Sequence, residues 1–548
     1  MQKFVLFFFL AISSTGAGAQ HLLLKKGMKI DRSVTIRAFD YNYRADTDLN
    51  NPFLTISGNN IVVDFNGAIL TGASSGMLPN EFSGLAIKIE KGKNITIKNL
   101  HVHGFRIALY AEEVEQLKIE NADFSFNYRP GNNLDKNRKP NQANDLAAVV
   151  LNNCLHTAIS NSAITNNHIG LLVKNSSGSF VHNSNVSYNS AHGILLANAD
   201  DGKYLYNKII FNYGDSSDQS SSAIKLSGTS SGNLFYKNAI THHINGAIIQ
   251  LENMLVMKNV FMENDFSFAV QKGIVNYSDN TLVNKNRIYN TTLAVESTDA
   301  ENVVISNNHF RFNETGIHLR NSGSGIIHHN LFYMDDVAFK LDKNIFNTDQ
   351  TDKLVAVLVA NSFNQNRVVY DIHHADSVAE FNNVYNSYEI LFRSDTSMFN
   401  IDPMENDELL VRLSEDYEPV LPEIENPENP FRGGNVYAGR QFILPGNWGP
   451  YNFSYPMAIA GEIDSTGHFE ILLAGPPGKV RILNDAGYEL LLPTDSALRK
   501  ILAKGQSGKN PASILLEFKG ERFRDESGRW HAAGKPFLFR PQLPLFKD

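Results

Sequence analysis

Short apolar strands recur along the chain, and each is followed at a fixed place by a polar residue that is usually Asn. Segments 158–164, 235–240 and 303–310 all show an apolar stretch, an Asn or Ser, one variable residue and another apolar residue. Most repeats are 21 to 23 residues apart, and the longer steps imply inserted loops. Aligned on the polar position, the repeats predict a ladder at Asn99, Asn121, Ser162, Ser184, Asn207, Asn238, Asn259, Asn286, Asn308, Asn330, Asn361 and Asn382.

A coil of about 22 residues can hold three short strands and three turns, each strand pairing with the coils above and below. Asn suits such a coil because it tolerates the left-handed backbone of a tight corner, and its amide can hydrogen-bond along the stack. A Gly that recurs after the ladder position is predicted to serve another sharp corner. The recurrent glycines are Gly170, Gly193, Gly246 and Gly316.

The competing repeat folds do not match this pattern. Leucine-rich repeats need a regular Leu frame, propeller blades need about 40 residues, and helical repeats need a period of 3.6. Crossovers between parallel strands are right-handed. We therefore predict an all-β chain whose main body is a right-handed parallel β-helix of about 12 coils or more.

The chain is predicted to contain five segments. They are a signal peptide at 1–19, an N-terminal cap at 20–54, the β-helix at 55–397, a segment at 398–435 and a β-sandwich at 436–548. Segment 398–435 is acidic and contains several prolines, so it is predicted to be a linker or an edge running along the solenoid. The β-sandwich, predicted from alternating strands and turn signals, would be a carbohydrate-binding accessory module or a cap.

The N-terminus predicts export to the periplasm or the extracellular space. Lys3 precedes an apolar run, Phe4–Ile12, and the small residues 17–19 offer a cleavage site. No later stretch is apolar enough for a membrane span, and the net charge of −8 does not favour a nucleic-acid partner. Cys154 is the one cysteine and is predicted to fill the core. We expect a monomer.

Loops inserted at one corner of a solenoid can wall off a groove. Insertions are predicted at 128–145, 213–221, 265–273 and 341–352, and the first two leave nearly the same corner. The first six coils are also rich in polar and aromatic residues, which suit sugar hydroxyls and sugar rings. The predicted substrate-binding residues are His101, His103, Asp123, Lys136, Arg138, Asp145, Tyr188, Asn189, Asn212, Tyr213, Asp215 and Asp218.

The loop at 129–139 is basic within an acidic protein, which suggests an anionic polysaccharide. Cleavage of a uronate chain by β-elimination needs a group that neutralises the carboxylate, a base and an acid. Arg129 is the candidate for the first role. The candidates for the base and the acid are Tyr128, His168, His192, His242 and His243. Hydrolysis would instead need two carboxylates, which Asp123, Asp145, Asp215 and Asp218 could supply.

Metal binding is a separate hypothesis. His101 and His103 lie on one face of a predicted strand, a usable spacing for a metal, whereas the adjacent pairs 242–243, 328–329 and 373–374 point to opposite sides. No metal site or cofactor is assigned from these patterns, although a divalent cation remains open.

The coils resemble the right-handed β-helix repeat proteins of the pectin-lyase-like superfamily, in particular the group with carbohydrate-binding and sugar-hydrolysis repeats and NosD-like periplasmic proteins. The resemblance covers residues 55–392, and the stretch 222–242 is similar to a coil common in that group. The resemblance implies the fold. It does not imply one function, because lyases, epimerases, hydrolases and non-catalytic proteins all share this fold. The D-P-H-D motif of the mannuronan epimerases is missing, because Asp402-Pro403 is followed by Met404.

The function that we expect is an exported carbohydrate-active protein that acts on a polysaccharide by lyase-type or related chemistry. The alternatives are a non-catalytic glycan-binding protein and a NosD-like copper-handling protein. The chain has ten Met and no Met/His/Cys copper motif, which weighs against copper handling.

Overall fold

The computed structural model describes most of the chain up to residue 430 and the strands of the C-terminal region. The described residues are 21–74, 77–130, 146–212, 220–251, 258–322, 325–342, 355–373, 377–394, 401–403, 418–424, 426–427, 430, 441–444, 458–463, 468–474, 481–483, 488–491, 501–507, 514–518, 523–525, 530–531 and 537–539. Residues 1–19, where the signal peptide is predicted, lie outside them. Among these residues, no helix is both long and apolar enough to cross a membrane.

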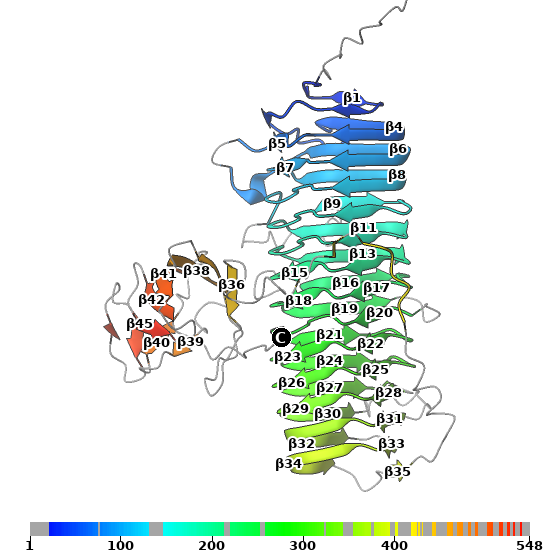
Figure 1. Ribbon diagram of the computed structural model, residues 1–548, viewed down its shortest axis with the longest axis vertical. Helices are drawn as coiled ribbons and strands as arrows, with labels where there is room; N and C mark the ends of the chain where they lie inside the picture. The colour runs from blue at the N-terminus through cyan, green and yellow to red at the C-terminus, as the bar shows by residue number, and fades with distance from the viewer. Residues whose placement is uncertain are drawn as a thin grey trace, which may run out of the picture.

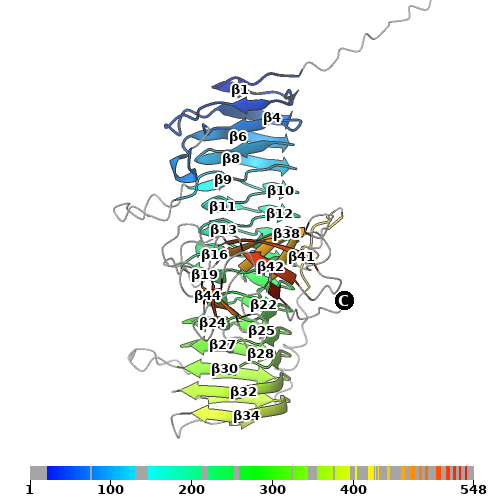
Figure 2. The same cartoon turned by 90° about the vertical axis from the view of Figure 1, so that its left-hand side faces the viewer.

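The main body is a solenoid with three faces of parallel strands (Figures 1 and 2), which confirms the predicted parallel β-helix. The long strands β4, β6 and β8 each run from one face into the next. The face on which they begin is called the first, and the face on which they end is called the second. The first face contains β1 (Met28–Ile30), β4 (Leu54–Asp64), β6 (Leu85–Lys98), β8 (Ile107–Glu120), β9 (Ala147–Asn152), β11 (Ile169–Ser177), β13 (His192–Asp200), β16 (Ser222–Gly228), β19 (Asn245–Leu251), β21 (Lys272–Asn276), β24 (Leu293–Thr298), β27 (Thr315–Arg320), β30 (Val337–Asp342), β32 (Ser362–His373) and β34 (Val384–Ser394).

The other two faces are built of shorter strands. The second face contains β2 (Val34–Thr35), β10 (Ala158–Ser160), β12 (Phe180–His182), β14 (Lys203–Leu205), β17 (Leu234–Tyr236), β20 (Val260–Met262), β22 (Leu282–Asn284), β25 (Val304–Ser306), β28 (Gly325–His328), β31 (Val355–Val359), β33 (Ser377–Phe381) and β35 (Ile401–Pro403). The third contains β3 (Asp40–Asn42), β5 (Ile69–Thr71), β7 (His101–His103), β15 (Lys208–Ile210), β18 (Ala239–Thr241), β23 (Arg287–Tyr289), β26 (His309–Arg311) and β29 (Leu331–Tyr333).

The core consists of the inward-pointing apolar residue of each strand, stacked from coil to coil. Its aromatic members form columns: the rings of Phe310, Phe332 and Phe363 stack with centroids 4.9 Å apart at each step. That spacing matches the separation of neighbouring strands, so each coil repeats the packing of the last.

Buried Asn and Ser side chains connect the coils at the predicted ladder. The side-chain oxygen of each accepts the backbone N–H of the residue one coil earlier, as Asn308 Oδ1 does from Asn286 N at 2.8 Å. The observed ladder runs through Ser162, Ser184, Asn207, Asn238, Asn264, Asn286, Asn308, Asn330, Asn361 and Asn383.

Four predicted ladder positions were wrong. Asn99, Asn121 and Asn382 each lie one residue before the ladder position, where φ is positive and the chain turns the corner. Asn259 belongs to a separate column, because its Oδ1 accepts from Asn233 N at 3.1 Å. The sequence pattern did not separate the corner position from the ladder position that follows it. Asn is favoured at the corner because it tolerates a positive φ, and at the ladder because its side chain forms hydrogen bonds.

The recurrent glycines serve close packing rather than a left-handed turn. A Cβ on Gly193 would lie 2.7 Å from the carbonyl oxygen of Ala223 and 2.8 Å from Asn212 Nδ2. Gly193 does not have a positive φ, so the prediction that this glycine forms a sharp corner was wrong. Glycine is needed there because a Cβ would collide with the next coil.

Residues 418–427, of which 425 is not described, run along the second face (Figure 1). Lys203 Nζ donates to Val420 O at 3.0 Å, Asn183 Nδ2 donates to Asn426 O at 3.3 Å, and Ile424 packs against an apolar cluster around Leu234. Of the two interpretations of segment 398–435, this part fits an edge along the solenoid.

The C-terminal strands form two antiparallel sheets. One contains β36 (Gln441–Leu444), β37 (Ala458–Ile463), β38 (His468–Ala474), β41 (Ile501–Ser507), β42 (Ile514–Phe518) and β45 (Phe537–Phe539). The other contains β39 (Arg481–Leu483), β40 (Tyr488–Leu491), β43 (Phe523–Asp525) and β44 (Trp530–His531). The 3-10 turn η1 (Pro79–Glu81) lies between β5 and β6.

Candidate functional site

The corner predicted from the sequence is only partly within the described residues. Six of its residues lie outside them: Lys136, Arg138, Asp145, Tyr213, Asp215 and Asp218. The other members fall into four groups with different surroundings.

The first group is buried and forms a second ladder. Asn167 N donates to Asn189 Oδ1 at 3.0 Å, Asn189 N donates to Asn212 Oδ1 at 2.9 Å, and Asn212 N donates to His243 Nδ1 at 3.0 Å. His243 Nε2 lies 2.8 Å from Ile209 O, and burial lowers the pKa of His243 to about 4. Asn189, Asn212 and His243 thus serve the fold in this structure, and they do not reach a surface where a substrate could contact them.

The second group is an aromatic stack beside this ladder. Phe211 lies 5.3 Å from Tyr188 and 4.8 Å from His242, and His242 lies 4.9 Å from Phe268, measured between ring centroids. Burial, and then the charge of His243, lowers the pKa of His242 to about 3. His242 is therefore neutral at pH 7 and is a poor proton acceptor, which does not suit the predicted acid or base.

The third group lies at the corner itself, and its members other than the buried Tyr128 are more accessible. The rings of Tyr128 and His168 meet edge to face at 6.4 Å, and His168 Nδ1 lies 3.0 Å from Ser190 Oγ. One coil further along, His192 Nδ1 lies 3.1 Å from Ser222 Oγ. Both histidines are half-buried, as is Arg129 next to Tyr128. The structure thus places Tyr128 and His168 in contact, and their roles as acid or base stay a prediction.

The fourth group is His101, His103 and Asp123, which the structure brings together on the third face. One ligand atom from each lies within 4.8 Å of the other two. The sequence alone predicted all three as substrate-binding residues and did not pair the histidines with Asp123.

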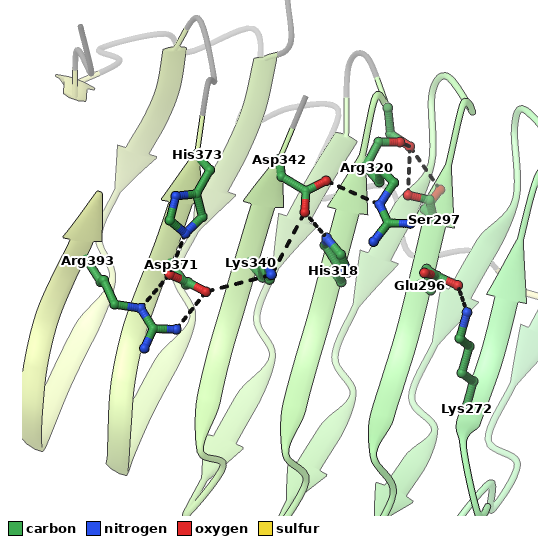
Figure 3. Close-up of polar contacts among 11 residues, drawn as sticks. Lys272, Glu296, Ser297, His318, Arg320, Lys340, Asp342, Asp371, His373 and Arg393 are labelled. Atoms are coloured by element: carbon green, nitrogen blue, oxygen red, sulfur yellow. Dashed lines mark hydrogen bonds and ion pairs between the residues drawn. The ribbon is translucent and has the colours of Figure 1, made fainter. Parts of the chain in front are cut away.

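A larger polar network, which the sequence did not predict, lies on the first face across β21 to β34 (Figure 3). We call it the charged face. Strand register aligns its side chains in two columns, because residues at equivalent positions of paired parallel strands stack. One column is Glu296, His318, Lys340, Asp371 and Arg393, and the other includes Arg320, Asp342 and His373, with Lys272 beside Glu296.

Asp371 is the most heavily paired carboxylate of the charged face. It accepts two hydrogen bonds from Arg393, at 2.6 Å from Nε and 2.8 Å from Nη2. His373 Nε2 lies 3.0 Å from Asp371 Oδ1, and Lys340 Nζ lies 4.0 Å from Oδ2. Burial alone would raise the pKa of Asp371, but the Arg393 hydrogen bonds and the charges of Arg393 and His373 outweigh it and lower the pKa.

Asp342 is paired in a similar way one strand earlier. His318 Nε2 lies 2.8 Å from its Oδ2, Arg320 Nε lies 3.3 Å from its Oδ1, and Lys340 Nζ lies 3.9 Å from Oδ2. Burial would raise the pKa of Asp342, but the hydrogen bond from His318 and the neighbouring positive charges lower it below its ordinary value. Both aspartates are therefore ionised at neutral pH.

On the charged face the cations are more exposed than the carboxylates, of which Asp342, at 22%, is the most exposed. The side chains of Arg320 and Arg393 are 47% and 43% exposed, whereas those of Asp371 and Glu296 are 4% and 5% exposed. Lys272 and Lys340 are also partly exposed, and they bring the cations of the network to four against three carboxylates. A ligand lying on this face meets positive charge first, although the whole chain carries a net charge of −8.

A signal for the charged face is present in the sequence. Ile317-His318-Leu319-Arg320 and Phe339-Lys340-Leu341-Asp342 alternate apolar and charged residues, and both segments follow the Gly or Ala that opens the strand. Counting outward positions from that residue would have aligned His318 with Lys340 and Arg320 with Asp342.

Comparison with known proteins identifies the fold. Residues 85–259 match the family described as right handed beta helix region, which agrees with the fold predicted from the coils. No curated protein sequence matches the chain.

Similar solved structures include a periplasmic alginate epimerase, AlgG, with 14% identity and a TM-score of 0.42, covering 61% of this chain and 77% of that chain. DFA-IIIase from Arthrobacter chlorophenolicus A6 has 12% identity and a TM-score of 0.36, covering 56% of this chain and 81% of its own. PfbA, a surface adhesin of Streptococcus pneumoniae, has 11% identity and a TM-score of 0.31, covering 67% and 84%.

Proposed function

We propose that this right-handed parallel β-helix protein is exported and acts on an anionic polysaccharide bound along the charged face. The observation that carries the proposal is the arrangement of cations that are more exposed than the carboxylates beside them, in an acidic chain. Neighbouring strands are about 4.8 Å apart, so the six strands from β21 to β34 span on the order of 25 Å, the length of several sugar units.

Arg320, Lys340 and Arg393 suit the carboxylates of a uronate chain, because charge-assisted hydrogen bonds to carboxylate are stronger than neutral ones. Asp342 orients His318 and Arg320, and Asp371 orients Arg393 and His373. The carboxylates thus hold the cations in place, which lowers the conformational cost of binding.

The same groups support chemistry next to a uronate carboxylate. A cation that neutralises this carboxylate makes the adjacent C5 proton easier to remove, and a neutral imidazole can take that proton. His373 is partly exposed and its ring is oriented by Asp371, so it is the proposed base. The electron pair left at C5 either expels the C4 oxygen, which takes a proton from the His373 imidazolium or from water and leaves as a hydroxyl group (elimination), or takes a proton from water on the opposite side of C5 (epimerisation).

Hydrolysis is less well supported by this site. A glycosidase needs one carboxyl group that remains protonated near neutral pH, to protonate the leaving oxygen. The pKa values of Asp342 and Asp371 are both lowered, so neither can serve as this acid at neutral pH.

Changing Arg320 or Lys340 to Gln is expected to weaken binding of polyuronates about 10- to 100-fold, because each change removes a charge-assisted contact. Affinity would be measured calorimetrically at low salt over a panel of anionic and neutral polysaccharides. Ultraviolet absorbance of unsaturated uronates would detect elimination, and proton NMR in D2O would detect epimerisation. Loss of turnover with unchanged affinity in His373→Ala would support its role as the base.

The matched control is Lys88→Gln. Lys88 lies on the same face in the same column as Lys340, and it also pairs with carboxylates, but it lies near the N-terminal end. Equal affinity of Arg320→Gln, Lys340→Gln and Lys88→Gln would contradict binding at the charged face. Binding without turnover would favour a glycan-binding protein, and a loss confined to His168→Ala and His192→Ala would move the site to the corner.

A further inference from the structure

We infer that His101, His103 and Asp123 bind a first-row divalent cation, with Zn²⁺ as the best fit. These residues lie on the third face, near the N-terminal end of the solenoid, whereas the charged face lies on the first face, in the C-terminal coils. The inference therefore stands independently of the proposed function.

The backbone fixes the three side chains on one side of the sheet. Successive residues of a strand point to opposite faces, so His101 and His103 point outward on either side of Val102, which is buried in the core. Asp123 belongs to the next coil and forms a parallel bridge with His101. Two ligands two residues apart on one strand and a third on its neighbour form a compact triangle.

The distances within this triangle suit a shared ion better than direct hydrogen bonds. His101 Nδ1 and His103 Nε2 each lie 3.9 Å from Asp123 Oδ2, which is longer than a hydrogen bond. Ligand atoms at ~2.1 Å from a tetrahedral Zn²⁺ are ~3.4 Å apart. Small side-chain rotations would therefore bring all three atoms into coordination.

Two further contacts orient the ligands. His103 Nδ1 lies 2.7 Å from the carbonyl oxygen of Ser125, which accepts its proton and leaves the lone pair on Nε2, the atom directed at Asp123. Asp123 Oδ1 accepts the backbone N–H of Ser125 at 3.0 Å, so its Oδ2 is directed to the histidines. A second hydrogen bond that fixes the tautomer and the rotamer is the usual support of a metal-binding His or carboxylate.

The donor set determines the type of metal. Two imidazole nitrogens and one carboxylate oxygen suit Zn²⁺ and its first-row neighbours, whereas Ca²⁺ and Mg²⁺ prefer oxygen ligands. All three side chains are partly exposed, so water or a ligand can take the remaining position. Within the described residues, this is the only group of three or more His, Cys, Asp or Glu residues whose ligand atoms lie close enough together to hold an ion.

The test uses the full mature chain, purified without a polyhistidine tag and stripped with a chelator. We expect it to bind Zn²⁺ in competition with a chromophoric chelator, and Co²⁺ to give the visible absorption of a low-symmetry site. His101→Ala, His103→Ala and Asp123→Asn should each weaken Zn²⁺ binding by more than about 100-fold, since even lost second-layer contacts cost 10- to 100-fold.

The matched control is His309→Ala, which removes an exposed His from the same face in the same column as His101. It should bind Zn²⁺ as the unaltered chain does. Circular dichroism would confirm that every variant is folded, and Zn²⁺ should raise the melting temperature of the unaltered chain and of His309→Ala only. Equal Zn²⁺ affinity in His103→Ala and His309→Ala, or no stoichiometric Zn²⁺ uptake by the unaltered chain, would overturn the inference.

Discussion

Replacing Asn308 by Ala is expected to lower the free energy of unfolding by about 3 to 5 kcal/mol. Asn308 is fully buried, and its Oδ1 accepts from both Asn286 N, at 2.8 Å, and Asn286 Nδ2, at 3.1 Å. Its Nδ2 donates to Val283 O at 2.9 Å. Alanine would leave these groups buried and without their partner, and each such group costs about 1 to 3 kcal/mol. Urea unfolding followed by circular dichroism would measure the loss.

The neighbouring Asn307 provides the control. It has φ of +56° and forms the corner, and its Nδ2 makes a half-buried hydrogen bond to Asn284 Oδ1 at 3.1 Å. Asn307→Gly should be nearly neutral, because Gly adopts a left-handed backbone without strain. If Asn308→Ala were no more destabilising than Asn307→Gly, the ladder would not contribute the stability assigned to it here.

This pair of residues also shows how far the fold could be predicted. The repeat, the parallel β-helix and the existence of a polar ladder followed from the spacing of Asn and apolar residues alone. The position of the ladder was uncertain by one residue, because Asn is favoured both at a left-handed corner and at a buried hydrogen-bonded site. Where the pair is Asn-Asn, as at 307 and 308, the sequence does not distinguish the two roles.

The candidate site was harder to predict because its members are distant in sequence. Lys340 and Asp371 are neighbours because β30 pairs with β32. An insertion between these strands makes their spacing in the sequence longer than the common repeat, so the repeat alone does not align the two residues. His243 illustrates the opposite problem. Its sequence context resembles that of a surface histidine, yet it occupies a ladder position that Asn holds in earlier coils. Only burial and hydrogen-bond partners separate a ligand-binding His from a structural one.

The second ladder contains one member with unusual chemistry. Asp335 is buried between Asn313 and Asn366 and accepts from Asn313 N at 2.8 Å and from Asn313 Nδ2 at 2.9 Å. Burial raises its pKa to about 8, although the hydrogen bonds and the charge of Arg311 oppose the shift. Its Oδ2 has no hydrogen-bond partner, whereas the amide nitrogen of Asn313 donates to Ile288 O at 3.0 Å. An ionised carboxylate at this position therefore lacks the donor that Asn supplies, whereas the protonated carboxyl group retains an O–H.

The raised pKa makes the stability of the fold depend on pH. Between an unfolded pKa near 3.8 and a folded pKa of about 8, the folded chain retains a proton that the unfolded chain has released. The contribution of Asp335 to stability is thus complete below pH 4 and is lost as the pH rises toward 8, at up to about 1.4 kcal/mol per pH unit. His242 and His243, with lowered pKa values, have the opposite effect between about pH 4 and 6.5.

Asp335→Asn is therefore expected to stabilise the protein, by on the order of 5 kcal/mol at pH 8 and by much less at pH 4. The amide removes the titration and supplies the missing donor. Urea unfolding of both chains at a series of pH values would measure the difference, in which the common effect of His242 and His243 cancels. Asn313→Asp would be the reciprocal variant and should create a similar loss of stability with rising pH. A pH-independent difference, or a variant less stable than the unaltered chain at pH 8, would show that Asp335 is not held protonated by its burial.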